Sequence, residues 1–195
     1  TLKNNRSVAG GGGITPDIIT ESTKKSDYIN TLWRKKLFLK FASIYVHNNS
    51  IKIPVVITDK IMSDFKFFLE GYDLEYFLPG EKELNKLEDK LSLYSASSES
   101  QDLLDRALFW RESKDKRLIN KLHKYYENEK TNQFENPSNY PWIKNGLQRE
   151  MSMILGGKEE HIRVSLFEDT DYLRAVEILK DSNNYYDILS KNSIE

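Results

Sequence analysis

Residues 27–46 read DYINTLWRKKLFLKFASIYV, and this stretch decides the fold. Its apolar side chains recur at steps of three to five residues, the spacing that places them on one face of an α-helix. They are Ile29, Leu32, Trp33, Leu37, Phe41, Ile44 and Tyr45. Asp27 can cap the first turn, and the polar run at 48–50 can end the helix. We therefore predict a helix from Asp27 to about Val46.

The same periodicity continues toward the C-terminus and predicts a mainly helical chain. Thr58 or Asp59 can cap a second helix, and Gly71 can serve as its C-terminal cap. Apolar side chains at helical spacing predict further helices over 84–94, 103–126, 142–155 and 172–179. The stretch 103–126 fits one long helix or two with a bend near Ser113. The pair Gly156–Gly157 should stop the helix that begins at Trp142.

Three stretches break this pattern. Residues 51–57 contain Pro54 and predict an extended connector or an edge strand, because proline cannot donate a hydrogen bond to a sheet. Residues 128–141 are rich in Asn and Pro and predict a loop. Residues 162–167 predict a short strand.

The chain before the first helix has a different composition. Gly10 to Gly13 form a glycine run, and ITPDIIT follows at 14–20. Glycine allows positive φ, and Pro16 restricts both itself and Thr15 to conformations that suit an extended exit. We predict a strand and a glycine turn over 1–20, followed by a helical region over 21–195.

Composition excludes several classes of function. The 195 residues carry 29 Lys and Arg against 30 Asp and Glu, and this near-neutral balance argues against a general nucleic-acid binder. The sequence has no cysteine, which excludes disulfides, thiolate catalysis and cysteine-based zinc sites. No apolar run is long enough to predict a membrane span. Aromatic residues make up 12% of the sequence, enough for a packed core.

The stretch RSVAGGGGITPDI at 6–18 resembles the last motif of the carboxyl-terminal processing serine peptidases, also called tail-specific proteases. In that family a Gly-Gly-Ile-x-Pro-Asp turn closes the protease core. The motif residues here are Gly11, Gly12, Gly13, Ile14, Pro16 and Asp17. Residues 37–46, 147–156 and 163–180 are similar to later segments of the Bacteroidetes-type members. The resemblance is loose between Pro79 and Tyr140, where we expect a lineage-specific insertion.

The resemblance implies a serine endopeptidase of the bacterial cell envelope or periplasm, with a PDZ-like module and a Ser/Lys catalytic pair. In the family these parts lie before the glycine motif, so no catalytic residue and no cofactor can be assigned within this chain. Its implied partners are the rest of the protease core and protein or peptide substrates, with a homo-oligomer also open. Residues 1–20 would be the end of the core. Because a strand removed from its sheet exposes unpaired backbone groups, we expect residues 1–25 to be disordered, or paired with another segment, when the chain is made alone.

Other chemistries fit less well. Gly10 to Gly13 lack the lysine and hydroxyl of a phosphate-binding loop. Ser7 with Lys24 or Lys25 could be imagined as a catalytic pair, but lysines in a polar connector stay charged and make poor bases.

The three histidines, at 47, 123 and 161, are dispersed, and Glu159-Glu160-His161 is read as a charged loop. Aromatic residues near Lys and Arg fit core packing better than single-stranded nucleic-acid binding.

A second hypothesis stays open beside the peptidase fragment. The chain could be a stand-alone helical interaction module that has kept only the tail of an ancestral peptidase. A third, an independent hydrolase, predicts that a serine-reactive probe labels this chain, and we expect no labelling.

Overall fold

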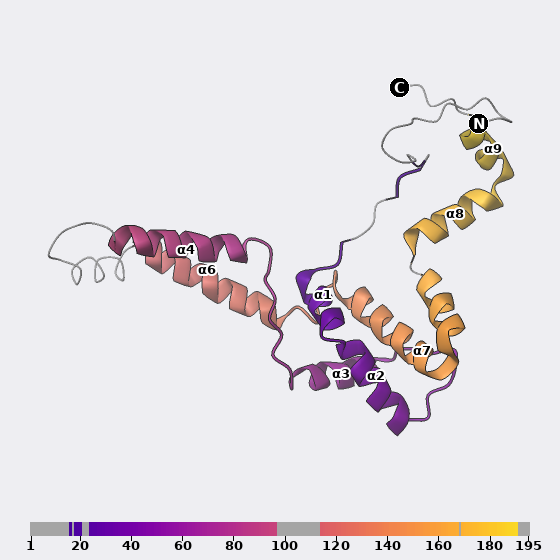
Figure 1. The fold of residues 1–195 in the computed structure, drawn as a ribbon, viewed down its shortest axis with the longest axis horizontal. Coiled ribbons are helices and arrows are strands. Elements are labelled where there is room, and N and C mark those ends of the chain that lie inside the picture. The colour runs from indigo at the N-terminus through magenta and orange to yellow at the C-terminus, as the bar shows by residue number, and fades with distance from the viewer. Residues whose placement is uncertain (1–15, 17, 21–23, 97–113, 168, 191–195) are drawn as a thin grey trace.

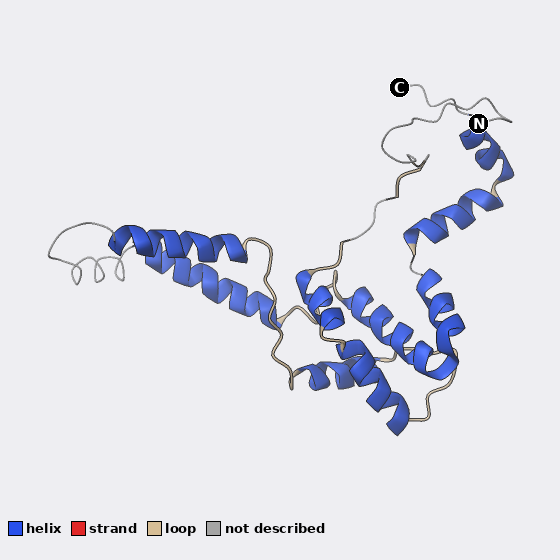
Figure 2. Cartoon of the chain, in the orientation of Figure 1, coloured by secondary structure: helices blue, strands red, loops and turns tan. Residues whose placement is uncertain are grey.

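The computed structural model describes residues 16, 18–20, 24–96, 114–167 and 169–190. Within these residues every regular element is a helix (Figure 1; Figure 2). The helices are α1 (Asp27–Arg34), α2 (Leu37–Asn48), α3 (Asp59–Leu69), α4 (Glu81–Ala96), α6 (Lys114–Thr131), α7 (Tyr140–Leu166), α8 (Thr170–Lys180) and α9 (Ser182–Ser190). The predicted helical class is confirmed for the described residues. The strand and glycine turn predicted before Pro16 lie outside them.

The predicted continuous helix over 27–46 is wrong, because a break at Lys35 and Lys36 divides it into α1 and α2. Lys36 has φ 56° and ψ 33°, in the left-handed region, so the chain leaves one helix and starts the next in a new direction. The break brings Leu37 and Phe38 into the core, where both side chains are fully buried. Apolar spacing alone could not show it, since both lysines also fit the polar face of one long helix.

Side-chain caps start the first and third helices. The Ser26 hydroxyl, one residue before the predicted Asp27, accepts the backbone N–H of Ile29 at 3.3 Å. Thr58 accepts the N–H of Ile61 at 3.4 Å, as predicted for α3. The C-terminal cap of α3 is Glu70, one residue before the predicted glycine.

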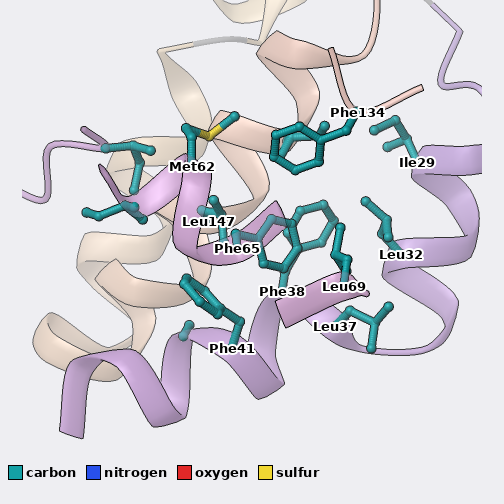
Figure 3. Close-up of a cluster of buried hydrophobic side chains, with 14 of the residues drawn as sticks. Ile29, Leu32, Leu37, Phe38, Phe41, Met62, Phe65, Leu69, Phe134 and Leu147 are labelled. Carbon is teal, nitrogen blue, oxygen red and sulfur yellow. The ribbon is translucent and has the colours of Figure 1, made fainter. Parts of the chain in front are cut away.

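The hydrophobic core lies where α1, α2 and α3 surround the first half of α7 (Figure 3). Phe38 and Phe65 stack at its centre, with ring centroids 5.3 Å apart. Leu147 and Met151 of α7 are fully buried beside them. Because these side chains come from three helices, α2, α3 and α7, burying them holds the central body together.

The connector between α2 and α3 is extended but forms no strand, so the edge-strand reading of 51–57 is wrong. Val55 and Ile57 are buried, while Val56 between them is exposed. The Gln148 side chain donates to the backbone oxygen of Val55 at 2.9 Å. This bond to α7 satisfies a backbone group that a sheet would otherwise pair.

Helices α4 and α6 lie side by side and project from the body as a hairpin (Figure 1). Leu84 and Ile119 are the buried apolar residues among the hairpin side chains that the structure describes. The Glu88 carboxylate accepts from the Lys116 ammonium and lies 2.7 Å from the His123 ring nitrogen Nε2. The helix α6 runs to Thr131, so the predicted loop at 128–141 starts too early. The segment 97–113, which contains the predicted bend near Ser113, lies outside the described residues.

The first half of α7 ends at the glycine pair, as predicted, and a second helical half follows directly after it. Gly157 has φ 72° and ψ −162°, which bends the helix sharply and lets it resume. The predicted strand at 162–167 is therefore wrong, because this run forms the last turns of α7. The second half returns toward the first, where the His161 Nδ1 atom lies 3.3 Å from the Arg149 carbonyl oxygen. Val164 is buried in this second half.

The second half of α7 leads into α8 and α9, which extend away from the body (Figure 1). Asp169 caps α8 by accepting the N–H of Tyr172 at 2.9 Å. Helix α9 was not predicted. None of the helices that the structure describes combines the length and the apolar character needed to cross a bilayer.

Candidate functional site

A groove lies where the base of the α4–α6 hairpin meets the central body, and we call it the junction groove. Its cavity volume is about 780 Å³. The start of α1, the 77–83 turn, the C-terminal half of α6 and the turn before α7 supply its walls. The lining is mixed: aromatic rings, carboxylates, lysines and side-chain amides all contribute.

One side of the groove is fixed by a buried amide network. Asn139 is 2% exposed, and its Nδ2 donates to both the backbone oxygen and the Oε1 atom of Gln133, at 3.0 Å each. The Ser26 hydroxyl donates to Asn139 Oδ1 at 2.7 Å. One buried side chain therefore joins the start of α1, the segment after α6 and the start of α7.

Two tyrosines stand between the groove and the core. The rings of Tyr28 and Tyr76 meet edge to face, with centroids 5.2 Å apart. The Tyr76 hydroxyl donates to the backbone oxygen of Lys130 at 3.1 Å. Burial raises the pKa of Tyr76 to about 12, and the nearby charge of Glu81 adds to the rise. Burial likewise raises the pKa of Tyr28 far above its usual range. Both hydroxyls are therefore neutral hydrogen-bonding groups near pH 7, not bases.

A buried carboxylate fixes the hairpin to the body. Glu81, at the start of α4, is 8% exposed. Its Oε1 pairs with the Lys130 ammonium at 2.5 Å, and its Oε2 accepts the N–H of Leu78 at 2.9 Å. The same ammonium lies 5.6 Å from the Tyr76 ring centroid and 5.7 Å from that of Phe77. A buried charge needs such partners, so this cluster sets the angle at which the hairpin leaves the body.

The turn before α4 has little room to vary. Gly80 has φ 85°, a conformation that other residues rarely adopt. A Cβ at this position would lie 2.8 Å from the Tyr126 hydroxyl oxygen. That hydroxyl donates to the Pro79 carbonyl at 3.1 Å. The turn and α6 therefore hold each other in place.

The segment that enters α1 from the N-terminal side is held by two tryptophans. The Lys25 ammonium lies 5.0 Å from the Trp142 ring centroid and 5.6 Å from that of Trp33. The Arg149 guanidinium lies over Trp33 at 5.7 Å. These cation–π contacts join the entering chain to α1 and α7. These contacts therefore fix the position of the chain at Lys25, where it enters the helical body.

These groups are suited to holding segments together. Nucleophilic catalysis needs a hydroxyl beside a base, and Ser26, one of the two serines that line the groove, instead donates to an amide oxygen of Asn139. Among the described residues no group of three or more His, Asp or Glu side chains is placed to bind a metal ion. The arrangement therefore supports recognition or mechanical coupling between the hairpin, the entering chain and the core.

Of the candidate catalytic and binding residues singled out in the sequence, Lys25 lines the groove, while the others that the structure describes lie elsewhere. Gly11, Gly12, Gly13, Ile14, Asp17 and Ser7 lie outside the described residues, while Pro16 and Lys24 are described and exposed. His47 is exposed at the end of α2. Glu160 bonds to Arg163, which lowers the pKa of its carboxyl, and Glu159 is exposed on the same helix. The predicted charged loop at 159–161 is therefore wrong, because these residues are helical.

Reasoning from sequence missed the residues that build the groove. Glu81 begins a run of alternating charges, a pattern typical of a solvated helix face, and Gln133 and Asn139 lie in the predicted loop at 128–141. All three side chains are buried. A faint signal existed for Glu81, because an acidic residue directly after Pro-Gly suits the first turn of a helix. No local pattern marks which amide of an Asn-rich turn becomes buried.

Comparison with known protein families gives a match over residues 28–179, to the family described as "Probable PDZ-protease, C-terminal helical domain". No curated protein and no solved structure matches the chain significantly. The family match covers more than half of the chain and runs from α1 to α8, so it includes the core, the hairpin and every described helix of the groove. This chain belongs to the family of C-terminal helical domains of probable PDZ-proteases.

Proposed function

We propose that this chain is the C-terminal part of a carboxyl-terminal processing serine endopeptidase of the bacterial envelope. One observation supports this most: a helical domain of the PDZ-protease family follows, in the same chain, a glycine motif that resembles the end of a tail-specific protease core. In this proposal residues 1–20 end the core and residues 21–195 form the helical region. The Ser/Lys pair and the PDZ-like module lie upstream of both.

The helical region acts as a support for the protease core in this proposal. The Lys25 contacts with Trp33 and Trp142 fix where the chain enters the helical body. Core residues just upstream would therefore be held at a set position relative to α1 and α7. The buried tyrosines and amides of the junction groove supply rigidity and contribute no chemistry to peptide-bond hydrolysis.

The stand-alone interaction module is the second candidate, and one observation favours it. The buried apolar cluster is built from α1, α2, α3, the first half of α7 and nearby turns, and among the residues that the structure describes it includes none before Tyr28. A helical region that forms its own hydrophobic core can fold without an attached protease.

Two observations distinguish the candidates: the reading frame upstream of Thr1, and whether its product cleaves a protein. A frame that encodes a PDZ-like module and a Ser/Lys pair, whose product cleaves a protein near its C-terminus, supports the peptidase. Substitution of the upstream serine should abolish cleavage, while the purified 195-residue chain should neither cleave nor be labelled by a serine-reactive probe. A frame that starts close to Thr1 would favour the interaction module. Cleavage by the isolated chain, lost on changing one of its own serines, would overturn both.

A further inference from the structure

The exposed face of α6 carries an apolar stripe with a basic border. Leu118, Leu122 and Tyr125 occupy positions i, i+4 and i+7 and are 58%, 38% and 56% exposed. Helical geometry places the cations at 114, 117, 121 and 124 along one side of this stripe. All four are exposed, and none forms an ion pair with another described residue. This surface fits a partner that is apolar and acidic.

The C-terminal arm, defined as residues 159–190, has the complementary character. Its described residues include seven carboxylates and three Lys or Arg. Two of these three cations are taken up inside the arm, Arg163 by Glu160 and Arg174 by Glu177. Large apolar side chains are exposed on every part of the arm. They include Phe167, Tyr172, Leu173, Leu179, Tyr185 and Tyr186.

These two surfaces cannot meet within one chain. The hairpin and the arm leave the central body on opposite sides (Figure 1). A second copy, turned about a two-fold axis, would bring each hairpin beside the arm of the other copy. Both contacts then form together, and the symmetry closes the assembly at two chains.

We propose that two copies of this chain form such a dimer, with the α6 stripe of each chain against the C-terminal arm of the other. The apolar side chains supply the buried area, and the basic border faces the carboxylates of the arm. The proposal does not depend on the protease function, because it concerns only surfaces of the helical region. A stand-alone interaction module would form the same dimer.

The test is the molar mass of the purified chain, measured by light scattering over a range of concentration and salt. A dimer is expected whose dissociation constant rises about tenfold or more between about 50 mM and 500 mM NaCl, because exposed charge pairs are screened. A monomer at every concentration would overturn the proposal. A molar mass above that of a dimer would also overturn it, because a two-fold assembly closes at two chains and cannot add a third.

Charge reversal makes the test specific. The double variant Arg117→Glu/Lys121→Glu on α6 should weaken the dimer about tenfold or more, and so should Asp171→Lys/Glu177→Lys on the arm. In a mixed dimer of the two double variants one contact is native and the other has both charges swapped, so opposite charges meet at both contacts. A mixed dimer should therefore form that neither variant forms alone. The matched control for the α6 variant is Lys52→Glu/Lys144→Glu, which makes the same change in net charge at exposed positions of the body and should leave the dimer intact. Equal weakening by the control would contradict the proposed surface.

Disulfide cross-linking tests the proposed contact directly, without reversing charges that could also affect folding. Because the sequence has no cysteine, a chain with Lys121→Cys mixed with a chain with Glu177→Cys can form a disulfide only through the introduced thiols. The mixed disulfide should exceed both homodisulfides under mild oxidation. A random distribution of the three products would count against the contact. Circular dichroism checks that each variant keeps its helices.

Discussion

Gly146 of α7 lies so close to Phe38 of α2 that a Cβ at this glycine would be 2.9 Å from three ring carbons. These two helices make the most extensive contact between any pair in the described fold. Phe38 is fully buried and also stacks on Phe65, so its ring has no free direction in which to move. The close approach of α2 and α7 therefore depends on residue 146 being a glycine, which has no side chain.

Gly146→Ala should destabilise the fold despite the higher helix propensity of alanine. The added methyl must displace a packed aromatic ring, and overpacking of this kind costs about 1–3 kcal/mol. Propensity alone would instead stabilise by up to about 1 kcal/mol. Urea unfolding followed by circular dichroism gives the difference in unfolding free energy.

The matched control for that substitution is Gly71→Ala. The nearest atom to a Cβ there is the Phe68 backbone oxygen at 3.6 Å, an ordinary contact. Its effect should stay within about 0.5 kcal/mol, as for other surface changes. A stabilised Gly146→Ala protein would show that α2 and α7 can separate without cost.

The sequence predicts the helical class and most helices because apolar spacing reports which face of a segment is buried. It fails where tertiary contacts decide the local conformation. Lys36 adopts a left-handed conformation although nothing in KKLF marks a break. Ile162 and Val164 suit a strand by propensity, yet they become helical because the chain folds back onto α7 after Gly157.

The candidate site is less predictable than the fold, because its residues come together only in three dimensions. Ser26, Gln133 and Asn139 are separated by up to 113 residues, and their hydrogen bonds follow from the packing of three segments. The glycine motif, by contrast, is visible in the sequence but lies almost entirely outside the described residues. Local patterns thus reveal the resemblance, while the junction groove needs the structure.

Lys25→Ala should loosen the entering chain from the helical body. It removes the cation between Trp33 and Trp142, a loss of about 0.5–1 kcal/mol at an exposed site. The tryptophan emission of the folded protein should change, and limited proteolysis before Ser26 should become faster. Lys25→Arg should preserve both properties, because guanidinium groups also stack on indole rings.

Lys24→Ala is the control for this position, since Lys24 is exposed and one residue away. It removes the same charge without touching either tryptophan. Equal proteolysis of the two alanine variants would mean that the tryptophans do not hold the entering chain.

Asn139→Ala should be among the most destabilising polar substitutions in the protein. It removes two donated bonds to Gln133 and the acceptor of the Ser26 hydroxyl, and the Asn139 and Gln133 side chains are buried. Leaving buried partners unsatisfied costs about 1–3 kcal/mol. Denaturant unfolding measures the loss. Asn132→Ala removes a single exposed bond at 3.3 Å and should cost far less, so similar losses for the two would argue against the buried network.

The α4–α6 hairpin should lose stability in acid through Glu88. A hydrogen bond from Lys116 has the largest effect, and together with one from His123 it holds the pKa of this carboxyl below its usual range. Folding therefore favours the ionised form, and its contribution is complete above the ordinary pKa of about 4.3. The contribution is lost as the pH falls through the lowered value, when the carboxyl takes up a proton. Hydrogen exchange of α4 and α6 amides, corrected for intrinsic rates, should show weaker protection in this range.

Glu88→Gln isolates that effect, because the amide cannot ionise. The variant should have a less protected hairpin at pH 6, and its protection should change less than that of the original chain as the pH falls toward about 3. Glu83→Gln is the matched control, since Glu83 is an exposed carboxylate on the same helix. If Glu88→Gln kept the full acid response of the hairpin, the response would have to come from another carboxylate on α4 or α6.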